Sequence, residues 1–210
     1  LFIPLAEEND LIDEVTAVML ERALHQCSRW RAEGLSLQLA VNLSVNSLER
    51  LDLPEYLVGV TEKAELSPSQ VVLEVTESRL SDNPTALLDI TTRLRLKRFE
   101  LSIDDFGTGY SSLQQLQRLP FTELKIDQAF VTGAAEDAKA RSILESSADL
   151  ARRLGMKIVA EGIESQADWD LVADLGCDLA QGYFIARPMP GEEIMGWLDE
   201  WRAANKLIVV

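Results

Sequence analysis

Histidine and cysteine are almost missing from this chain of 210 residues, which holds one histidine and two cysteines. With His25 alone, neither a histidine-based zinc site nor a Ser-His-Asp catalytic triad is expected. Cys27 and Cys177 are far apart and form no Cys-x-x-Cys motif. Two isolated cysteines fit buried thiols in a reducing compartment better than a disulfide framework, so a cytoplasmic location is expected.

Basic residues are also scarce: 20 lysines and arginines stand against 35 aspartates and glutamates, which gives a net charge of −15. This balance argues against DNA or RNA as a partner, because phosphate backbones are bound by basic surfaces. It does not argue against a small anionic substrate whose charge is neutralised by bound cations. No apolar run approaches the ~20 residues of a membrane span, although a longer parent protein could still be membrane-anchored.

Strand and helix signals alternate along the whole chain, which predicts an α/β protein with a parallel sheet, right-handed crossovers and a single domain over residues 1–210. The expected strands are Leu39–Ser44, Val71–Glu77, Leu101–Asp105, Glu123–Asp127, Lys157–Glu161 and Leu179–Phe184. The expected helices are Leu11–Glu33, Pro54–Leu66, Pro84–Arg98, Ser112–Leu119, Ala138–Leu154, Ser165–Leu175 and Pro190–Asn205.

Polar residues suited to ligand binding stand at or near the C-terminal end of every expected strand: Asn42, Glu74, Asp104 with Asp105, Lys125, Glu161 and Gln181. Because parallel strands open onto one face at these ends, the residues are expected to converge on one acidic pocket. Such residues on all six strands favour a TIM-like (β/α) barrel over an open doubly wound sheet. A closed barrel has eight strands and ~250 residues. About two strands are therefore unaccounted for, and the abrupt opening LFIPLAEEND suggests that they precede Leu1.

The pair Asp104-Asp105 is the strongest chemical signal in the sequence. Adjacent carboxylates at a strand end repel each other unless cations or hydrogen-bond donors offset them. Gly107 and Gly109 are expected to break the strand so that both side chains face the pocket. A helix cap is the plainer alternative, but carboxylates at equivalent positions of other strands favour metal binding.

Carboxylates together with Asn42 form a hard oxygen donor set that suits Mg²⁺ or Mn²⁺. Two such ions ~3.5–4 Å apart would suit in-line attack on a phosphodiester. Lys125 is expected either to orient the attacking water and hold developing negative charge, or to form a salt bridge with a neighbouring carboxylate.

Three further residues are candidates with weaker signals. Glu77 lies beyond the second strand and is expected either to accept hydrogen bonds from the glycine-rich loop 106–112 or to be a surface glutamate. Gln181 is expected to contact the substrate or water, or to satisfy the backbone at its strand end. Glu164 follows Glu161 across a glycine; it is less well placed for the barrel mouth and is a second candidate contact to substrate or water.

These segments resemble the EAL domain, a family of bacterial cyclic di-GMP phosphodiesterases with a TIM-like barrel. The resemblance rests on six ordered motifs: VNLSVNSL (41–48), LEVTES (73–78), IDDFGTGYSSL (103–113), LKIDQAFV (124–131), VAEGIES (159–165) and QGYFIARPMP (181–190). The opening LFIPLAEENDLI also resembles the segment that follows the family's signature. The Glu-Ala-Leu signature itself and the arginine behind it are absent from the chain. Because Leu1 starts in mid-motif and every downstream site residue is intact, an N-terminally incomplete EAL domain is favoured over a naturally shortened one.

The resemblance implies a role for each matching residue. The matches of Asn42, Glu74 and Asp104 bind one ion in the family, and those of Asp104, Asp105 and Glu161 bind a second. Lys125 matches the lysine that positions the attacking water, and Glu77 matches the glutamate that orders the DDFGTGYSS loop, which is tied to dimerisation. The implied reaction is hydrolysis of cyclic di-GMP to linear pGpG, in a homodimer whose parent carries a sensory or cyclase domain. A catalytically inactive cyclic di-GMP receptor and a dimerising interaction module are the alternatives, and the truncated chain itself could be inactive.

Overall fold

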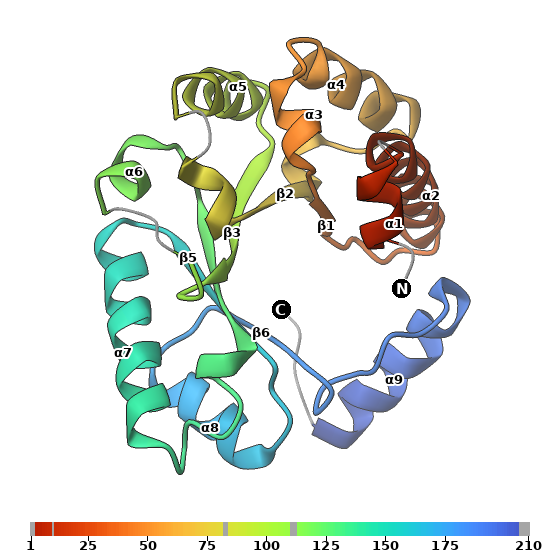
Figure 1. Ribbon diagram of the computed structural model, residues 1–210. Coiled ribbons are helices and arrows are strands. Elements are labelled where there is room, and N and C mark those ends of the chain that lie inside the picture. Colours follow the sequence, from red (N-terminus) through yellow and green to blue (C-terminus); the bar gives the residue numbers. More distant parts are fainter. Residues whose placement is uncertain (1–2, 10, 82–83, 110–112, 206–210) are drawn as a thin grey trace.

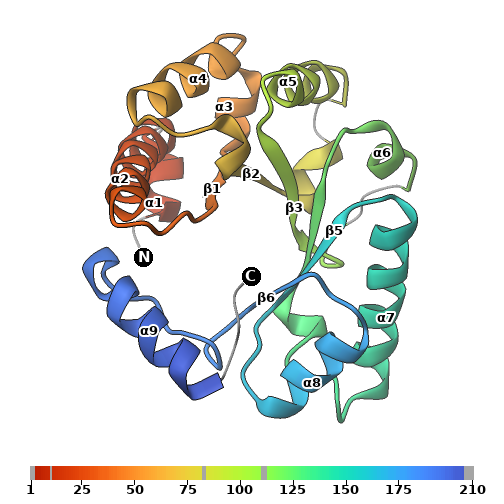
Figure 2. The ribbon, with the colours of Figure 1, turned by 180° about the vertical axis from the view of Figure 1, so that it is seen from behind.

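The computed structural model describes residues 3–9, 11–81, 84–109 and 113–205. Six parallel strands form one sheet in which the spatial order follows the chain order (Figure 1). The strands are β1 (Leu39–Asn42), β2 (Val71–Thr76), β3 (Glu100–Phe106), β4 (Glu123–Ile126), β5 (Lys157–Glu161) and β6 (Leu179–Gln181). The helices lie outside the curved sheet, as in an incomplete (β/α) barrel (Figures 1 and 2). The predicted fold class is confirmed and each of the six predicted strands is present, although β1 ends at Asn42 rather than Ser44 and β6 at Gln181 rather than Phe184.

Helices connect successive strands, as the right-handed crossover of a parallel sheet requires. They are α1 (Ile3–Glu8), α2 (Ile12–Ala32), α3 (Val45–Glu49), α4 (Leu53–Lys63), α5 (Pro84–Leu96), α6 (Leu113–Arg118), α7 (Ala138–Arg153), α8 (Gln166–Asp174) and α9 (Ile194–Asn205). Short 3₁₀ helices are η1 (Pro68–Gln70), η2 (Glu77–Ser81), η3 (Gln128–Phe130) and η4 (Gly191–Glu193). Among these helices, the sequence did not predict α1, α3 or the four 3₁₀ turns, and the expected helix from Pro190 begins instead as η4.

Local signals explain where the longer helices begin. The side chain of Asp137 accepts hydrogen bonds from two backbone N–H groups in the first turn of α7, and Ser165 forms a capping box with Asp168 at the start of α8. Both caps satisfy donors that the first helical turn leaves unpaired. Pro84 is the first residue of α5, where a missing N–H costs nothing.

The two faces of the sheet have opposite chemistry, because side chains alternate along a strand. The outward face packs against the helices and carries the apolar core, including Leu73, Leu101 and Leu124, all fully buried. The inward face carries the alternate residues, and among these Glu74 and Lys125 are polar yet buried. The apolar runs that identified the strands therefore describe one face only, and the polar residues between them fill the inside of the incomplete barrel.

The centre and the edges of the sheet differ in burial. β2, β3 and β4 are almost entirely buried, whereas β1 and β6 alternate between exposed and half-buried residues. Each of these two edge strands pairs with a single neighbour among the described residues. Near the edges, Trp30 of α2 donates its indole N–H to the carbonyl of Gly191 in η4, at 3.0 Å. This bond links the N-terminal helices to the segment that leads into α9.

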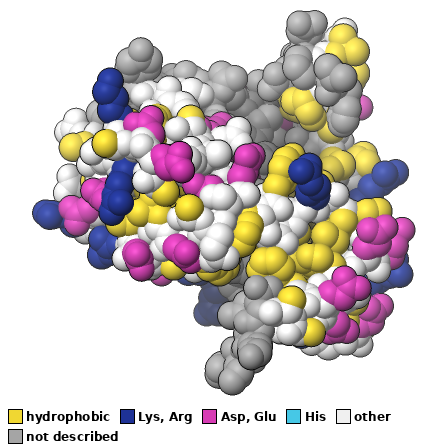
Figure 3. Space-filling model, turned by 90° about the horizontal axis from the view of Figure 1, so that it is seen from below, with side chains coloured by type: hydrophobic (Ala, Val, Ile, Leu, Met, Phe, Trp, Pro, Cys, Tyr) yellow, Lys and Arg dark blue, Asp and Glu magenta, His cyan; other side chains and the backbone are white. Residues whose placement is uncertain are grey.

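On the face seen from below, hydrophobic side chains gather in a broad area with acidic side chains beside it (Figure 3).

On α9, Trp197 and Trp201 stack with their ring centroids 5.8 Å apart, as their i, i+4 spacing predicts. A search of the described helices for one long and apolar enough to cross a bilayer found none.

Candidate active site

The ammonium group of Lys125 stands at the centre of the inward face, in the middle of β4. Its Nζ lies 2.8 Å from a carboxylate oxygen on each of three other strands: Glu74 on β2, Asp104 on β3 and Glu161 on β5. Lys125 and Glu74 side chains are each 7% exposed. Four adjacent strands thus contribute one charged side chain apiece, and this position is compatible with Lys125 both as a salt-bridge partner and as a site residue.

The pKa values of Lys125, Glu74 and Glu161 are shifted by burial and by the neighbouring charges. Burial alone would lower the pKa of Lys125, but Glu74, Asp104 and Glu161 together raise it above its ordinary value. Burial raises the pKa of Glu74 and of Glu161 despite the opposing attraction of Lys125. When all four groups are ionised, three negative charges face one positive charge. The cluster is therefore short of positive charge, and cations would be attracted to it.

Asp105 joins Asp104 and Glu161 in a second cluster, in which one carboxylate oxygen of each residue lies within 4.8 Å of those of the other two. Two consecutive strand residues can share a face here because β3 contains a bulge. Ile103 pairs with Leu124 and Phe106 pairs with Ile126, so β3 has one more residue than β4 between the two pairs.

The bulge corrects the expectation that Gly107 and Gly109 break the strand. β3 continues through Asp105 to Phe106, and the backbone irregularity lies within the strand at Asp105, whose φ is +54°. Aspartate tolerates this left-handed conformation better than most residues with a side chain. The turn at Asp105 therefore lets Asp104 and Asp105 face the same pocket.

The oxygen atoms of this second cluster suit a hard divalent cation such as Mg²⁺ or Mn²⁺. The pKa of Asp105 is raised, first by burial and then by the neighbouring charges of Asp104 and Asp127. Asp127 directly follows β4, two residues after Lys125, and its carboxylate accepts a hydrogen bond from the N–H of Ala129 at the start of η3. Carboxylates gathered this closely repel one another, and a divalent cation would stabilise them.

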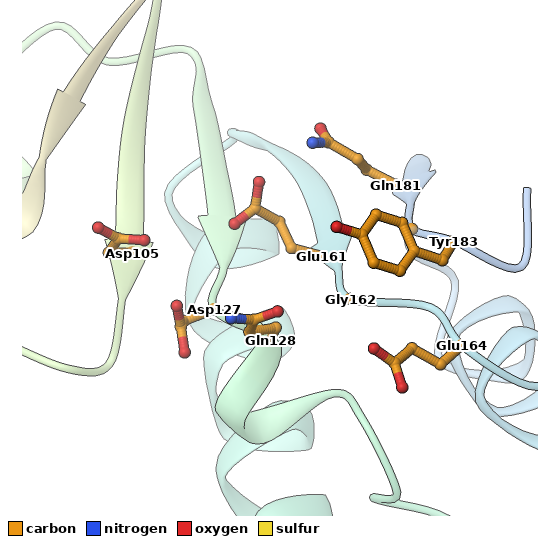
Figure 4. Close-up of a pocket in the computed structure, with 9 residues that line it drawn as sticks. Asp105, Asp127, Gln128, Glu161, Gly162, Glu164, Gln181 and Tyr183 are labelled. Atoms are coloured by element: carbon orange, nitrogen blue, oxygen red, sulfur yellow. The ribbon is translucent and has the colours of Figure 1, made fainter. Parts of the chain in front are cut away.

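A cavity of about 270 Å³ opens beside these carboxylates (Figure 4). It is lined by Asp105, Asp127, Gln128, Glu161, Gly162, Glu164, Gln181, Gly182 and Tyr183. Glu164 and Gln181, both named from the sequence, thus lie at the cavity. The sequence reasoning missed Asp127, Gln128 and Tyr183. Asp127 carried a usable signal, since it follows Lys125 by two residues and is the last residue of the expected strand Glu123–Asp127.

Glu77 ties the end of β2 to the loop after β3. It is buried at the start of η2, and its Oε2 accepts hydrogen bonds from the N–H groups of Gly107 at 2.8 Å and Gly109 at 3.0 Å. Gly107 has φ +104°, and a Cβ there would lie 2.7 Å from the Phe130 ring. Only glycine fits this turn without strain. Residues 110–112, the rest of the expected loop, lie outside the described part of the chain.

Asn42 lies beside Glu74, on the edge strand of the sheet. It ends the edge strand β1, is exposed, and pairs in register with Glu74. It does not line the acidic cavity. The structure therefore brings Asp104, Asp105 and Glu161 together, joins Glu74 to them through Lys125, and leaves Asn42 one strand further out.

Known proteins match this chain over most of its length. The EAL domain family model matches residues 1–188. The chain is 40% identical over 195 residues to the bifunctional diguanylate cyclase/cyclic di-GMP phosphodiesterase MucR of Pseudomonas aeruginosa, a match that covers 92% of this chain and 28% of MucR. The first curated relatives are all much longer, and the chain spans about a third of their length or less.

Two solved structures show the same fold. The PaMucR phosphodiesterase in complex with c-di-GMP matches with a TM-score of 0.87 and 40% identity, over 92% of this chain and 78% of that one. BlrP1 of Klebsiella pneumoniae, in a manganese/cy-diGMP complex at pH 9.0, matches with a TM-score of 0.72 and 31% identity, over 80% of this chain and 43% of that one.

Proposed function

The chain belongs to the EAL domain family, and from this membership we propose that residues 1–210 form most of an EAL domain that hydrolyses one phosphodiester bond of cyclic di-GMP, releasing linear pGpG. The observation that carries the proposal is the convergence of Asp104, Asp105 and Glu161 within 4.8 Å at the edge of a cavity. The names of similar proteins support it, since MucR and PA2567 of Pseudomonas aeruginosa are both cyclic di-GMP phosphodiesterases.

Divalent cations, Mg²⁺ or Mn²⁺, are the cofactors in this proposal, and two ions are the proposed number. Asn42, Glu74 and Asp104 would hold one of them. Asp104, Asp105 and Glu161 would hold the other, and their carboxylate oxygens suit that role. The manganese and calcium complexes of BlrP1 with cyclic di-GMP support the use of a divalent ion. Bound cations of this kind neutralise phosphate charge and activate water for attack.

Lys125 is proposed to act as a fixed positive charge. Its pKa is raised by three carboxylates, so the ammonium stays protonated at neutral pH and cannot serve as a general base. It holds Glu74, Asp104 and Glu161 in one orientation. During the reaction, it is proposed to orient the attacking water and to stabilise negative charge that develops on the phosphate oxygens.

Three residues around this centre have supporting roles in the proposal. Glu77 orders the loop after β3 through its two backbone hydrogen bonds. Gln181 and Glu164 line the cavity and are proposed to contact the substrate or water. A homodimer and an attached sensory or cyclase domain complete the proposal, and relatives such as MucR and the oxygen sensor protein DosP of Escherichia coli support the attached domain.

The test is incubation of the chain with cyclic di-GMP and Mn²⁺, with chromatography for pGpG and calorimetry for binding. The variant Asp104→Asn keeps the side-chain shape but removes a charge shared by both proposed ion sites. We expect its hydrolysis to fall by at least about 100-fold, since metal ions contribute several kcal/mol to such reactions. Asp199→Asn, an exposed aspartate on α9, is the matched control and should leave the rate unchanged. Hydrolysis of cyclic di-GMP by Asp104→Asn at the rate of the unmutated chain would refute the two-ion assignment.

A cyclic di-GMP receptor without turnover is the second candidate. It is favoured by one observation: Lys125 already pairs with three of the proposed ligand residues and so competes with a cation for them. Binding without pGpG formation, both in this chain and in a longer protein that contains it, would support the receptor. Hydrolysis by either protein would exclude it.

A further inference from the structure

An aromatic residue stands out in the lining of the acidic cavity. Tyr183 is 55% exposed, whereas the other lining residues are carboxylates, amides and glycines. The ring of Tyr183 reaches into the cavity, with its hydroxyl directed toward Glu161 (Figure 4). The guanidinium carbon of Arg187 lies 4.6 Å from the ring centroid. The cavity thus has a flat, partly exposed π surface backed by a cation.

The backbone holds this pair in a fixed position. Ile163 donates its N–H to the carbonyl of Gln181 at 3.0 Å, and Phe184 donates its N–H to the carbonyl of Ile163 at 2.9 Å. These two bonds bring the chain so close that a Cβ on Gly182 would collide with the backbone of Ile163. Phe184 in turn packs against Trp169 of α8, with ring centroids 6.3 Å apart. Tyr183 therefore projects from a tight turn that is fixed on both sides, and little ordering entropy would be lost on binding.

Arg187 is the cation best placed to meet an anionic ligand at this rim. Asp105, Asp127, Glu161 and Glu164 line the cavity, and no lysine or arginine does among the described residues. Lys125 is buried and engaged by three carboxylates. Arg187 is exposed and, within the described part of the chain, makes no ion pair. A guanidinium stacked by its face on an aromatic ring keeps its N–H edges available for a phosphate.

We propose that Tyr183 and Arg187 form a recognition subsite for the half of the dinucleotide that lies away from the bond being hydrolysed. This inference rests on the proposed function. A cyclic dinucleotide has two phosphates and two bases, so one phosphate at the carboxylate cluster leaves a second base and a second phosphate to be bound. Tyr183 stacks on the base, since every nucleobase offers a π face. Arg187 pairs with the second phosphate through its N–H edges.

Calorimetry of cyclic di-GMP binding in Ca²⁺ tests this subsite. Tyr183→Ser removes the ring and should weaken binding by about tenfold or more, the range for loss of one base–aromatic stack. Arg187→Gln should weaken binding by about five- to tenfold and make the remaining affinity less sensitive to salt. Tyr183→Phe keeps the ring and should bind within about twofold of the unmutated chain. If the chain turns over, both weakened variants should raise KM with little change in kcat.

The molecule supplies a matched control. Arg50 lies over the ring of Tyr56, 5.6 Å from its centroid, and this second arginine–tyrosine pair does not line the acidic cavity. Arg50→Gln makes the same charge change as Arg187→Gln and should bind normally. Circular dichroism and thermal melting of each variant would confirm that it is folded.

Four results would overturn the subsite. Unchanged binding in Tyr183→Ser and Arg187→Gln would refute it while the proposed function stood. Equal losses in Tyr183→Phe and Tyr183→Ser would assign the effect to the hydroxyl rather than to stacking. Equal losses in Arg50→Gln and Arg187→Gln would indicate a general charge effect. If the unmutated chain neither binds nor hydrolyses cyclic di-GMP, the proposed function of this chain fails, and the subsite fails with it.

Discussion

The central and the edge strands of the sheet build their parts of the site in different ways. β2 to β5 place Glu74, Asp104 and Glu161 in a largely buried cluster in which each carboxylate contacts Lys125 directly. At the edge strand β6, Gln181 is exposed, and its backbone, rather than its side chain, is held by hydrogen bonds. In the centre, each charged side chain is stabilised by the opposite charge of its neighbours. At the edge, the position of each side chain is set by the backbone turn that carries it.

This difference predicts where substitutions will be costly. Removing one charge from the centre leaves the others buried without compensation, and such losses reach several kcal/mol. Removing one polar group at the edge exposes its partner to water, which replaces most of what was lost. Stability should therefore depend mainly on the centre, and ligand recognition mainly on the edge.

Lys125→Met provides the most severe test of the centre. The variant leaves the buried Glu74 and Asp104 and the half-buried Glu161 without their cation, and we expect the free energy of unfolding to fall by about 3–5 kcal/mol at pH 7. Urea titration measures this loss. Lys139→Met, at an exposed position of α7, should change stability by no more than about 0.5 kcal/mol. A Lys125→Met protein as stable as the unmutated one would show that the centre is not held by charge.

Acid should partly rescue the same variant. The pKa values of Glu74 and Glu161 are already raised by burial, and removal of Lys125 raises them further. A carboxyl with a raised pKa binds its proton more tightly in the folded state, so the free energy of unfolding rises as pH falls. The loss caused by Lys125→Met should therefore shrink between pH 7 and pH 5, and a loss independent of pH would contradict this account.

Glu77→Ala tests the connection between the centre and the loop after β3. It leaves the N–H groups of Gly107 and Gly109 without their acceptor, which costs about 2–3 kcal/mol in a partly buried setting. We expect turnover to fall through loosening of the loop, with Mn²⁺ affinity changed less. Calorimetry with Mn²⁺ decides between the two effects. A loss of Mn²⁺ affinity as large as that of Asp104→Asn would place Glu77 among the ligands.

Trp30→Phe tests the edge. It removes the single hydrogen bond to the carbonyl of Gly191, a loss of about 1 kcal/mol. Hydrogen exchange should become faster in the segment 191–205 and stay unchanged in β2 to β4, because the edge opens without the centre. Equally faster hydrogen exchange in both regions would show that the centre and the edge open together.

Glu123→Gln should have the smallest effect, and it differs in sign. Glu123 lies on β4, and burial raises the pKa of its carboxyl. The contribution of such a group to the free energy of unfolding falls as the pH rises above the pKa that glutamate has in the unfolded chain, about 4.3. The glutamine variant lacks this loss, so it should be more stable by about 0.5–1 kcal/mol at pH 8 and equal to the unmutated protein near pH 4. Denaturant titration at the two pH values measures the difference.

The sequence predicted the centre of the molecule better than its edges. Strands β2 to β5 carry apolar residues on the helix-facing side, and the charged residues Glu74, Asp104, Lys125 and Glu161 occupy alternate positions on the inward side. The position of a strand and the period of two are local properties. These four residues could therefore be assigned to one pocket from the sequence alone, and the family motifs led to the same residues.

What the sequence did not reveal depends on contacts between segments. The bulge at Asp105 arises from the pairing of β3 with β4, and the pattern of β3 alone does not contain it. The last strand was expected to reach Phe184, but β6 ends at Gln181 because Gly182 turns against the backbone of Ile163. That overestimate hid Tyr183, which the pattern placed inside the strand. Helix α1 is six residues long and contains a proline, so its sequence gave no helical period to detect.

The strand order has a consequence for how the chain folds. Each new strand pairs with the one before it, from β1 through β6. During synthesis, every strand therefore finds its partner already made, and the loop to be closed is only one helical crossover long. The bond from Trp30 to Gly191 spans 161 residues and forms only when almost all of the described chain is present. Folding from the N-terminus can thus assemble the buried charge cluster as soon as β5 emerges, before the edge that carries Tyr183 exists.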